Sequence, residues 1–94
     1  MKRYLVAGNW KMNLNKEESL GLVRAILDQL KPSSHVGVAV CPPAVYLDCV
    51  AQLVRGSSVG LGGQDLYPKN DGAFTGEISG KMLIDVGCQY VILG

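Results

Sequence analysis

Four short apolar runs constrain the fold of this chain more than any other feature. They begin at Tyr4, Val36, Val59 and Tyr90, and each ends at a glycine or a proline. An apolar run without polar alternation is typical of a parallel strand that is covered on both faces. We therefore expect four parallel strands, the first of them over 4–7 and buried on both faces.

The stretch after the first run carries the signals of a helix start. Asn15 is a favourable N-cap residue, and Glu18, three positions later, completes a capping box. Apolar residues then recur at helical spacing until Lys31-Pro32 ends the helix. These residues are Leu20, Val23, Leu27 and Leu30.

Two more helices are predicted further along the chain. Pro42-Pro43 opens a second helical stripe that ends before Gly56, a residue suited to the position just after a helix. The stripe consists of Tyr46, Leu47, Val50, Leu53 and Val54. A third helix is expected over 79–86, with three inward-facing residues, namely Met82, Leu83 and Val86. The resulting β-α-β-α-β-α-β order predicts an α/β fold with parallel strands and right-handed helical crossovers.

Composition narrows the classes of function. With 94 residues and a net charge of +1, the chain makes one compact unit and lacks the basic balance typical of proteins that bind nucleic acids or anionic membranes. No apolar run is long enough to span a membrane. Cys41, Cys49 and Cys88 are not spaced as metal ligands and are expected to be reduced, which indicates a cytoplasmic protein. Gly60–Gly63 departs from the spacing of a dinucleotide-binding loop.

Two features do not fit a finished domain. The chain stops on an apolar strand, which a following helix would normally cover. The connection Gln64–Glu77 is long and carries Leu66, Tyr67 and Phe74, which are poorly suited to water. Either this loop packs on its own body or another chain covers it, and we expect the sequence to be a piece of something larger.

Ligands of α/β folds bind at the carboxyl ends of parallel strands, and this rule selects the residues that follow each run. They are Asn9-Trp10-Lys11, Cys41-Pro42-Pro43 and Gln64-Asp65. Lys11 can offer a compact positive charge to an anionic ligand, and the Asn9 amide can donate to a carbonyl or an oxyanion. By position alone, an ordinary solvated loop lysine is the commoner interpretation of Lys11. His35 is expected at the surface, Cys41 lacks a histidine partner, and no residue is clearly placed as a general base.

Three motifs resemble the triosephosphate isomerase family. The first is Val6-Ala7-Gly8-Asn9-Trp10-Lys11-Met12-Asn13, at the first strand and its loop. The second, similar to the third βα loop of the family, is Gln64-Asp65 with Gly72-Ala73-Phe74-Thr75-Gly76-Glu77-Ile78-Ser79. The third, Tyr90-Val91-Ile92-Leu93-Gly94, resembles the family's fourth strand. The resemblance spans the chain and implies that residues 1–94 are the N-terminal half of a single (β/α)8 TIM-barrel domain.

The resemblance implies roles for individual residues. Asn9 and Lys11 would bind a triose phosphate substrate, with Lys11 stabilising its phosphate and the developing enediolate charge. Gln64 and Asp65 would support the substrate-binding residues without touching the substrate, or they would anchor the third βα loop. A loop tip would insert into the neighbouring subunit of a homodimer, and it consists of Phe74, Thr75, Gly76 and Glu77. The implied reaction interconverts dihydroxyacetone phosphate and glyceraldehyde 3-phosphate in glycolysis and gluconeogenesis, without a cofactor or a metal.

The resemblance also implies which catalytic parts lie outside this sequence. In the family, a catalytic histidine directly follows the residues that match Leu93-Gly94, and the glutamate base, the lid loop and the main phosphate-binding amides come later. We expect the 94-residue chain alone to be inactive, since losing a general base typically costs about 10²–10⁴-fold in rate. Two other interpretations stay open. One is a non-catalytic half-barrel that associates with itself or with a complementary half, and the other is a small doubly wound binding domain of the flavodoxin type.

Overall fold

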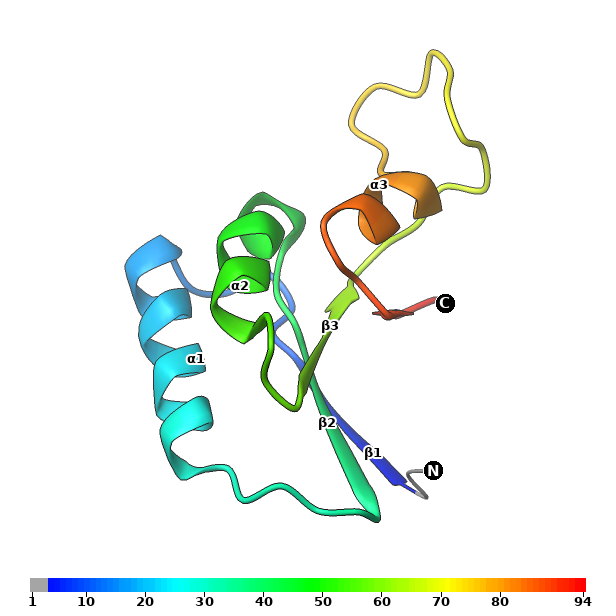
Figure 1. Ribbon diagram of the computed structural model, residues 1–94. Coiled ribbons are helices and arrows are strands. Elements are labelled where there is room, and N and C mark those ends of the chain that lie inside the picture. The colour runs from blue at the N-terminus through cyan, green and yellow to red at the C-terminus, as the bar shows by residue number, and fades with distance from the viewer. Residues whose placement is uncertain (1–3) are drawn as a thin grey trace.

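The computed structural model describes residues 4–94, which form a four-stranded parallel sheet in the order β1-β2-β3-β4. The strands are β1 (Tyr4–Asn9), β2 (Val36–Cys41), β3 (Val59–Gly63) and β4 (Tyr90–Val91). The helices are α1 (Lys16–Gln29), α2 (Leu47–Val54) and α3 (Gly80–Asp85), and a 3-10 turn, η1 (Ala44–Tyr46), precedes α2. Each helix connects two successive strands on the same side of a curled sheet (Figure 1), which confirms the predicted alternation.

The strand register lines up the carboxyl ends of β1 and β2. Their paired residues run from Tyr4 opposite Val36 to Asn9 opposite Cys41. β3 pairs with β2, and β4 pairs with β3 at Gly62. Because all of these pairs are parallel, the loops that follow β1, β2 and β3 emerge at the same edge of the sheet.

The core lies between the helices and the side of the sheet that faces them. Its buried residues come from all three helices, from β2 and β3, and from the loop after β1: Trp10, Val23, Val40, Leu47, Val50, Ala51, Val54, Val59, Leu61 and Leu83. Full burial of a valine or leucine side chain stabilises a fold by about 1.5–3 kcal/mol. This packing fixes the helices against the sheet and thereby holds the strand ends in place.

The helix ends follow the predicted signals. The Asn15 side chain accepts a hydrogen bond from the Glu18 N–H at 2.8 Å, and the Glu18 carboxylate accepts one from the Asn15 N–H at 3.1 Å, which completes the capping box. The Ser79 hydroxyl oxygen caps α3 by accepting the N–H of Met82 at 3.1 Å. Gly56 follows the C-cap of α2 with a φ of +79°, a conformation that glycine adopts without steric cost.

The prediction that the first strand is buried on both faces is wrong. All six residues of β1 are exposed, and Tyr4 and Val6 keep 65% and 59% of their accessible surface. Within residues 4–94, β1 pairs only with β2, and the buried core contains residues of β2 and β3 but none of β1. The apolar residues of β1 therefore have no cover in the described part of the chain.

The third helix and the fourth strand are shorter than predicted, and one helical residue is oriented differently. Leu83 is buried as expected, whereas Met82 is 52% exposed. Neighbouring residues of a helix are about 100° apart around its axis, so the face that buries Leu83 leaves Met82 toward solvent. β4 ends at Val91 rather than at Leu93.

No helix within residues 4–94 has the length and apolar character needed to cross a membrane.

The long connection between β3 and α3 packs partly on itself. The rings of Tyr67 and Phe74 are in contact, with their centroids 4.4 Å apart, and the Tyr67 N–H donates to the Ile78 carbonyl at 2.8 Å. Phe74 nevertheless remains 38% exposed, and the loop projects from the body of the molecule (Figure 1). Contacts within the chain therefore cover only part of its apolar surface.

Candidate functional site

A hollow with a cavity volume of about 260 Å³ lies at the carboxyl ends of the strands. Lys11 and Met12 line it from the loop after β1, and Gln64 and Asp65 line it from the residues after β3. Its other lining residues are Pro43, Ala44, Leu47, Gly76, Ile78 and Leu83. The fold thus brings Lys11, Gln64, Asp65 and Gly76, all singled out in the sequence, around one hollow.

The remaining candidates lie elsewhere. Asn9 is the last residue of β1, and its side chain contacts the backbone of Lys11. Phe74 and Glu77 line a separate, smaller hollow of about 50 Å³ within the β3–α3 connection. Thr75 is exposed between them and lines neither hollow.

Lys11 has a backbone conformation that non-glycine residues rarely adopt. Its φ is +55°, in the left-handed region, which costs about 1–3 kcal/mol. The N–H of Lys11 donates to the side-chain oxygen (Oδ1) of Asn9 at 2.9 Å. The Lys11 side chain is exposed, and no ion pair of its ammonium group is seen within residues 4–94. Its charge is therefore available to an anion at the hollow.

Trp10 anchors the loop to the core immediately before Lys11. Its side chain is 8% exposed and belongs to the buried cluster between the helices and the sheet. The backbone N–H of Trp10 donates to the Cys41 carbonyl at 3.2 Å, and the backbone carbonyl of Trp10 accepts a hydrogen bond from Asn13 Nδ2 at 2.7 Å. Sequence reasoning gave no role to Asn13. A signal was available, because asparagine side chains in loops commonly bond nearby backbone groups.

Gln64 connects the ends of two strands at the hollow. Its Nε2 group donates to the Cys41 carbonyl at 2.8 Å, so this oxygen accepts hydrogen bonds from both Gln64 and Trp10. Asp65, the next residue, is exposed at the rim. The arrangement ties the loop that carries Lys11 to β2 and β3.

Burial disfavours the thiolate form of two cysteines, Cys41 and Cys88. Cys41 is 1% exposed, and burial raises the pKa of its thiol above the ordinary value of 9.0. Burial also raises the pKa of Cys88, with a smaller contribution from the negative charge that Cys41 would carry. A raised pKa reduces the thiolate fraction and with it the nucleophilicity.

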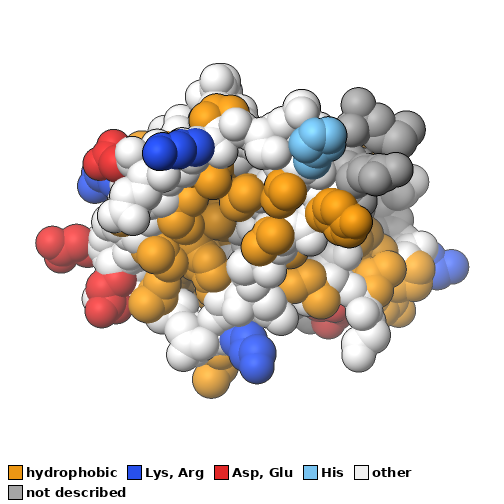
Figure 2. Space-filling model, turned by 90° about the horizontal axis from the view of Figure 1, so that it is seen from below, with side chains coloured by type: hydrophobic (Ala, Val, Ile, Leu, Met, Phe, Trp, Pro, Cys, Tyr) orange, Lys and Arg blue, Asp and Glu red, His pale blue; other side chains and the backbone are white. Residues whose placement is uncertain are grey.

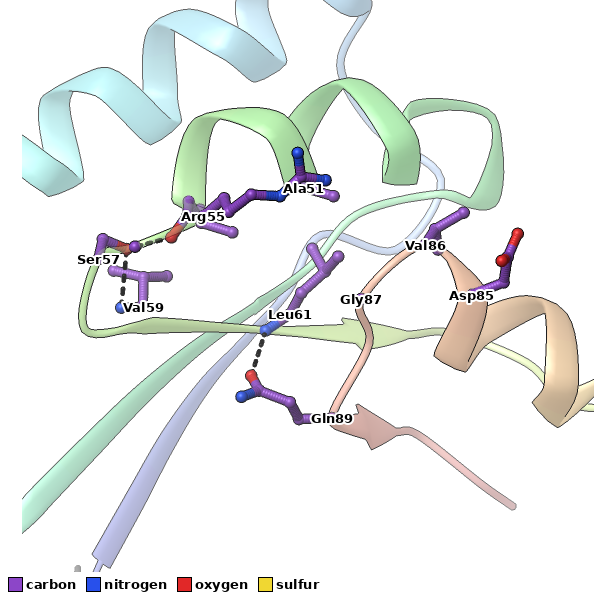
Figure 3. A pocket seen from close by; sticks show the side chains of 11 residues that line it. Ala51, Arg55, Ser57, Val59, Leu61, Asp85, Val86, Gly87 and Gln89 are labelled. Atoms are coloured by element: carbon purple, nitrogen blue, oxygen red, sulfur yellow. Dashed lines mark hydrogen bonds between the residues drawn. The ribbon is translucent and has the colours of Figure 1, made fainter.

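A second cavity, of about 220 Å³, lies at the opposite end of the strands, beside the ends of α2 and α3 (Figure 3). Arg55 and Asp85 bring charge to its walls. Its other polar side chains are already engaged, because the Ser57 hydroxyl bonds two backbone groups of the adjoining turn and the Gln89 side-chain oxygen accepts the Leu61 N–H at 3.4 Å. We therefore take the hollow at the carboxyl ends as the candidate site. Within residues 4–94, no three histidine, cysteine or acidic side chains lie together in a way that could hold a metal ion.

Comparison with known proteins settles the family. The family model described as triosephosphate isomerase matches residues 4–94, the whole described part of the chain. The chain belongs to the triosephosphate isomerase family. Its curled half-barrel of four parallel strands with outer helices corresponds to the N-terminal part of a TIM barrel, which confirms the predicted fold class.

Individual triosephosphate isomerases are similar along the full chain. The enzyme of Rhodopirellula baltica is 53% identical over 93 residues, which cover 99% of this chain and 37% of that protein. The enzyme of Chloroflexus aurantiacus is 51% identical over 94 residues, and that of Carboxydothermus hydrogenoformans is 48% identical over 94 residues. Each of these two matches covers 100% of this chain and 38% of the relative. The chain thus spans less than two-fifths of the length of these curated relatives.

Membership of the triosephosphate isomerase family also bears on the choice between the two cavities. Active sites of TIM barrels lie at the carboxyl-terminal face, whereas the opposite face contributes to stability. The hollow lined by Lys11 lies at the carboxyl-terminal face, and the cavity lined by Arg55 lies at the amino-terminal face.

Proposed function

We propose that residues 1–94 form the N-terminal half of a single TIM-barrel domain that acts as a triosephosphate isomerase. The reaction interconverts dihydroxyacetone phosphate and glyceraldehyde 3-phosphate, in glycolysis and gluconeogenesis, without a cofactor. The observation that carries the proposal is the placement of Lys11, whose exposed side chain borders the hollow at the carboxyl ends of the strands. A lysine ammonium group is a compact positive charge suited to the phosphate of such a substrate.

The chemistry needs charge stabilisation that Lys11 can supply. Moving a proton between two carbons of a triose passes through an enediolate, in which negative charge develops on oxygen. A preorganised donor or cation beside that oxygen lowers the barrier, and removing one such group typically costs about 10²–10³-fold in rate. We assign this role to Lys11. The Nδ2 group of Asn9 donates to the substrate, while its Oδ1 atom holds the Lys11 N–H at 2.9 Å.

The proton transfer requires groups that we place outside residues 1–94. His35 directly precedes β2, at the opposite end of the strands from the hollow. Asp65 is the only carboxylate among the described residues that line the hollow, and together with Gln64 we assign it to anchoring the loop. In the triosephosphate isomerase mechanism, a glutamate base moves the proton and a neutral histidine polarises the carbonyl. We therefore expect the 94-residue chain alone to show no turnover.

The proposed partner is a second copy of the protein, reached by the β3–α3 connection. The loop tip is exposed at all four positions, Phe74, Thr75, Gly76 and Glu77. The contact between Phe74 and Tyr67 presents a rigid aromatic group, which is typical of residues that anchor interfaces. The net charge of +1 lends no support to a nucleic acid or an anionic membrane as a partner. A cytoplasmic location is supported by the free cysteines Cys41, Cys49 and Cys88.

Exposed apolar surface favours a second candidate, a half-barrel module that associates with itself or with a complementary half. Figure 2 shows apolar side chains gathered over the face of the molecule seen from below. In β1, Tyr4, Leu5 and Val6 expose 65%, 46% and 59% of their surface, and one edge of the strand is unpaired within the described residues. Apolar patches and open strand edges both drive association.

A chimera tests the isomerase proposal. Residues 1–94 are joined to the part of the Rhodopirellula baltica triosephosphate isomerase that follows its matched segment. We expect the chimera to convert glyceraldehyde 3-phosphate to dihydroxyacetone phosphate and the 94-residue chain alone to be inactive. A folded chimera without activity would overturn the proposal. Turnover by the chain alone, near that of the intact relative, would overturn the assignment of the proton-transfer groups.

Sedimentation tests the second candidate. The 94-residue chain is centrifuged at micromolar concentration, alone and with the complementary segment of the same relative. Association in either sample supports a half-barrel module, and a folded monomer in both contradicts it.

A further inference from the structure

The loop that carries Lys11 contains two strained residues. Lys11 and Leu14 have φ values of +55° and +74°, and they are the two non-glycine residues with positive φ within residues 4–94. Such conformations persist only where the surrounding structure holds them, and they cluster at functional sites. The contacts that hold the backbone of Lys11 therefore set the direction in which its side chain leaves the loop.

Two asparagine side chains hold the peptide group between Trp10 and Lys11 at both of its ends. The N–H of this peptide donates to Asn9 Oδ1 at 2.9 Å, and its carbonyl accepts from Asn13 Nδ2 at 2.7 Å. A peptide group is planar, so bonds at its two opposite ends fix its rotation about the chain direction. That rotation sets the φ of Lys11. Asn9 is the last residue of β1 and therefore belongs to the sheet, while Asn13 bonds the same peptide group from the loop that follows.

We propose that Asn13 is a positioning residue for Lys11. It acts by fixing the orientation of the Trp10–Lys11 peptide group and thereby the direction of the Lys11 side chain. The inference rests on the proposed isomerase function and adds to it a residue that touches neither the reacting atoms nor the phosphate. Asn13 itself is exposed and lies outside every helix and strand.

The loop stays attached when the Asn13 contact is lost. The Trp10 side chain is buried in the core, and its N–H is bonded to the Cys41 carbonyl at 3.2 Å. Removing the Asn13 amide therefore frees one peptide group to rotate without detaching the loop. A displacement of about 1 Å in a catalytic group can cost on the order of 10²-fold in rate. We thus expect a large effect on activity and a small effect on folding.

A double-mutant cycle in the chimera separates positioning from a general structural role. Asn13→Ala is introduced beside the native Lys11 and also beside Lys11→Ala. We expect kcat/KM to fall about ten- to one-hundredfold in the first background and less than about twofold in the second. Gln52→Ala, an exposed amide on α2, serves as the control and leaves kcat/KM within about twofold. A similar fall in both backgrounds, or no fall in the first, overturns the proposal.

Two further readouts do not depend on turnover. Calorimetric titration with inorganic phosphate should show weaker binding after Asn13→Ala only where Lys11 is present. NMR of the chimera should show a strong contact between the amide and α protons of Lys11, which a positive φ produces, and this contact should weaken in Asn13→Ala. An inactive parent chimera defeats the proposed function and leaves the NMR result to decide the role of Asn13. A Lys11 signal unchanged by Asn13→Ala overturns the inference even in an active chimera.

Discussion

Gln64 donates a hydrogen bond from its side-chain Nε2 group to the carbonyl oxygen of Cys41 at 2.8 Å. The same oxygen accepts the N–H of Trp10 at 3.2 Å. One backbone carbonyl at the end of β2 thus links the residue after β1 to the residue after β3. Trp10 immediately precedes Lys11 in the chain, and Gln64 lines the same hollow as Lys11, so the link joins two sides of the proposed site.

Replacing Gln64 with glutamate should weaken this link. An ionised glutamate cannot donate to the Cys41 carbonyl and instead places negative charge against it, which we expect to destabilise the fold by about 2 kcal/mol. Urea unfolding of the chimera measures the change. Gln52→Glu makes the same chemical change at an exposed position on α2 and should cost less than about 0.5 kcal/mol. Equal effects of the two substitutions would show that the hydrogen bond contributes nothing.

Glycines of β3 allow close packing that a methyl group would prevent. A Cβ atom at Gly62 would lie 2.7 Å from the Cys41 Sγ and 3.3 Å from the Tyr90 Cβ. We expect Gly62→Ala to destabilise the chimera by about 1–3 kcal/mol. Gly21→Ala, in the middle of α1 with no heavy atom within 4 Å of the added Cβ, should instead stabilise it by about 0.5–1 kcal/mol. Thermal unfolding of both variants gives the two signs, and a neutral Gly62→Ala would contradict the packing argument.

The hydroxyl group of Ser19 is buried without a hydrogen-bond partner. Ser19 is fully buried within α1, and its Oγ atom is the one described side-chain atom of this kind. Removing an unsatisfied hydroxyl relieves a desolvation cost, so Ser19→Ala should stabilise the fold by about 1 kcal/mol. Chemical denaturation measures the gain, with Ser58→Ala at an exposed turn as the control. A loss of stability in Ser19→Ala would reveal a partner for this hydroxyl.

Stability should fall at alkaline pH because of the Cys41 thiol. Burial raises its pKa above 9.0, so the unfolded chain releases this proton at a lower pH than the folded chain does. The contribution is fully present below the unfolded pKa and is lost as pH rises through the folded one. We expect the free energy of unfolding to decline faster with rising pH, from about pH 8 upward, in the parent chimera than in Cys41→Ala. Parallel pH profiles of the two proteins would contradict this account.

Elements with local signals were predictable from the sequence. β2 has the predicted bounds, and Asn15 caps α1 with Glu18 as expected, because each signal involves only neighbouring residues. The first strand was predicted to be buried and Met82 to face inward, and both predictions were wrong. The burial of a strand or of a helix face depends on which distant segments pack against it. The apolar residues of the strand or helix alone do not specify these segments.

At the candidate site, positions were predictable but backbone geometry was not. The rule that ligands bind at strand ends selected Lys11, Gln64 and Asp65, and all three line one hollow. The left-handed φ of Lys11 left no signal in residue type, because lysine seldom adopts it. The role of Cys41 was equally hidden, since it acts through a backbone carbonyl that every residue possesses.

The catalytic efficiency of the chimera with Lys11→Ala tests the central claim most directly. Lys31→Ala, an exposed lysine after α1, is the matched control. We predict that Lys11→Ala lowers kcat/KM for glyceraldehyde 3-phosphate by at least about 10²-fold, while Lys31→Ala changes it by less than about twofold. A Lys11→Ala chimera that retains the kcat/KM of its parent would contradict the assignment of this hollow as the isomerase site.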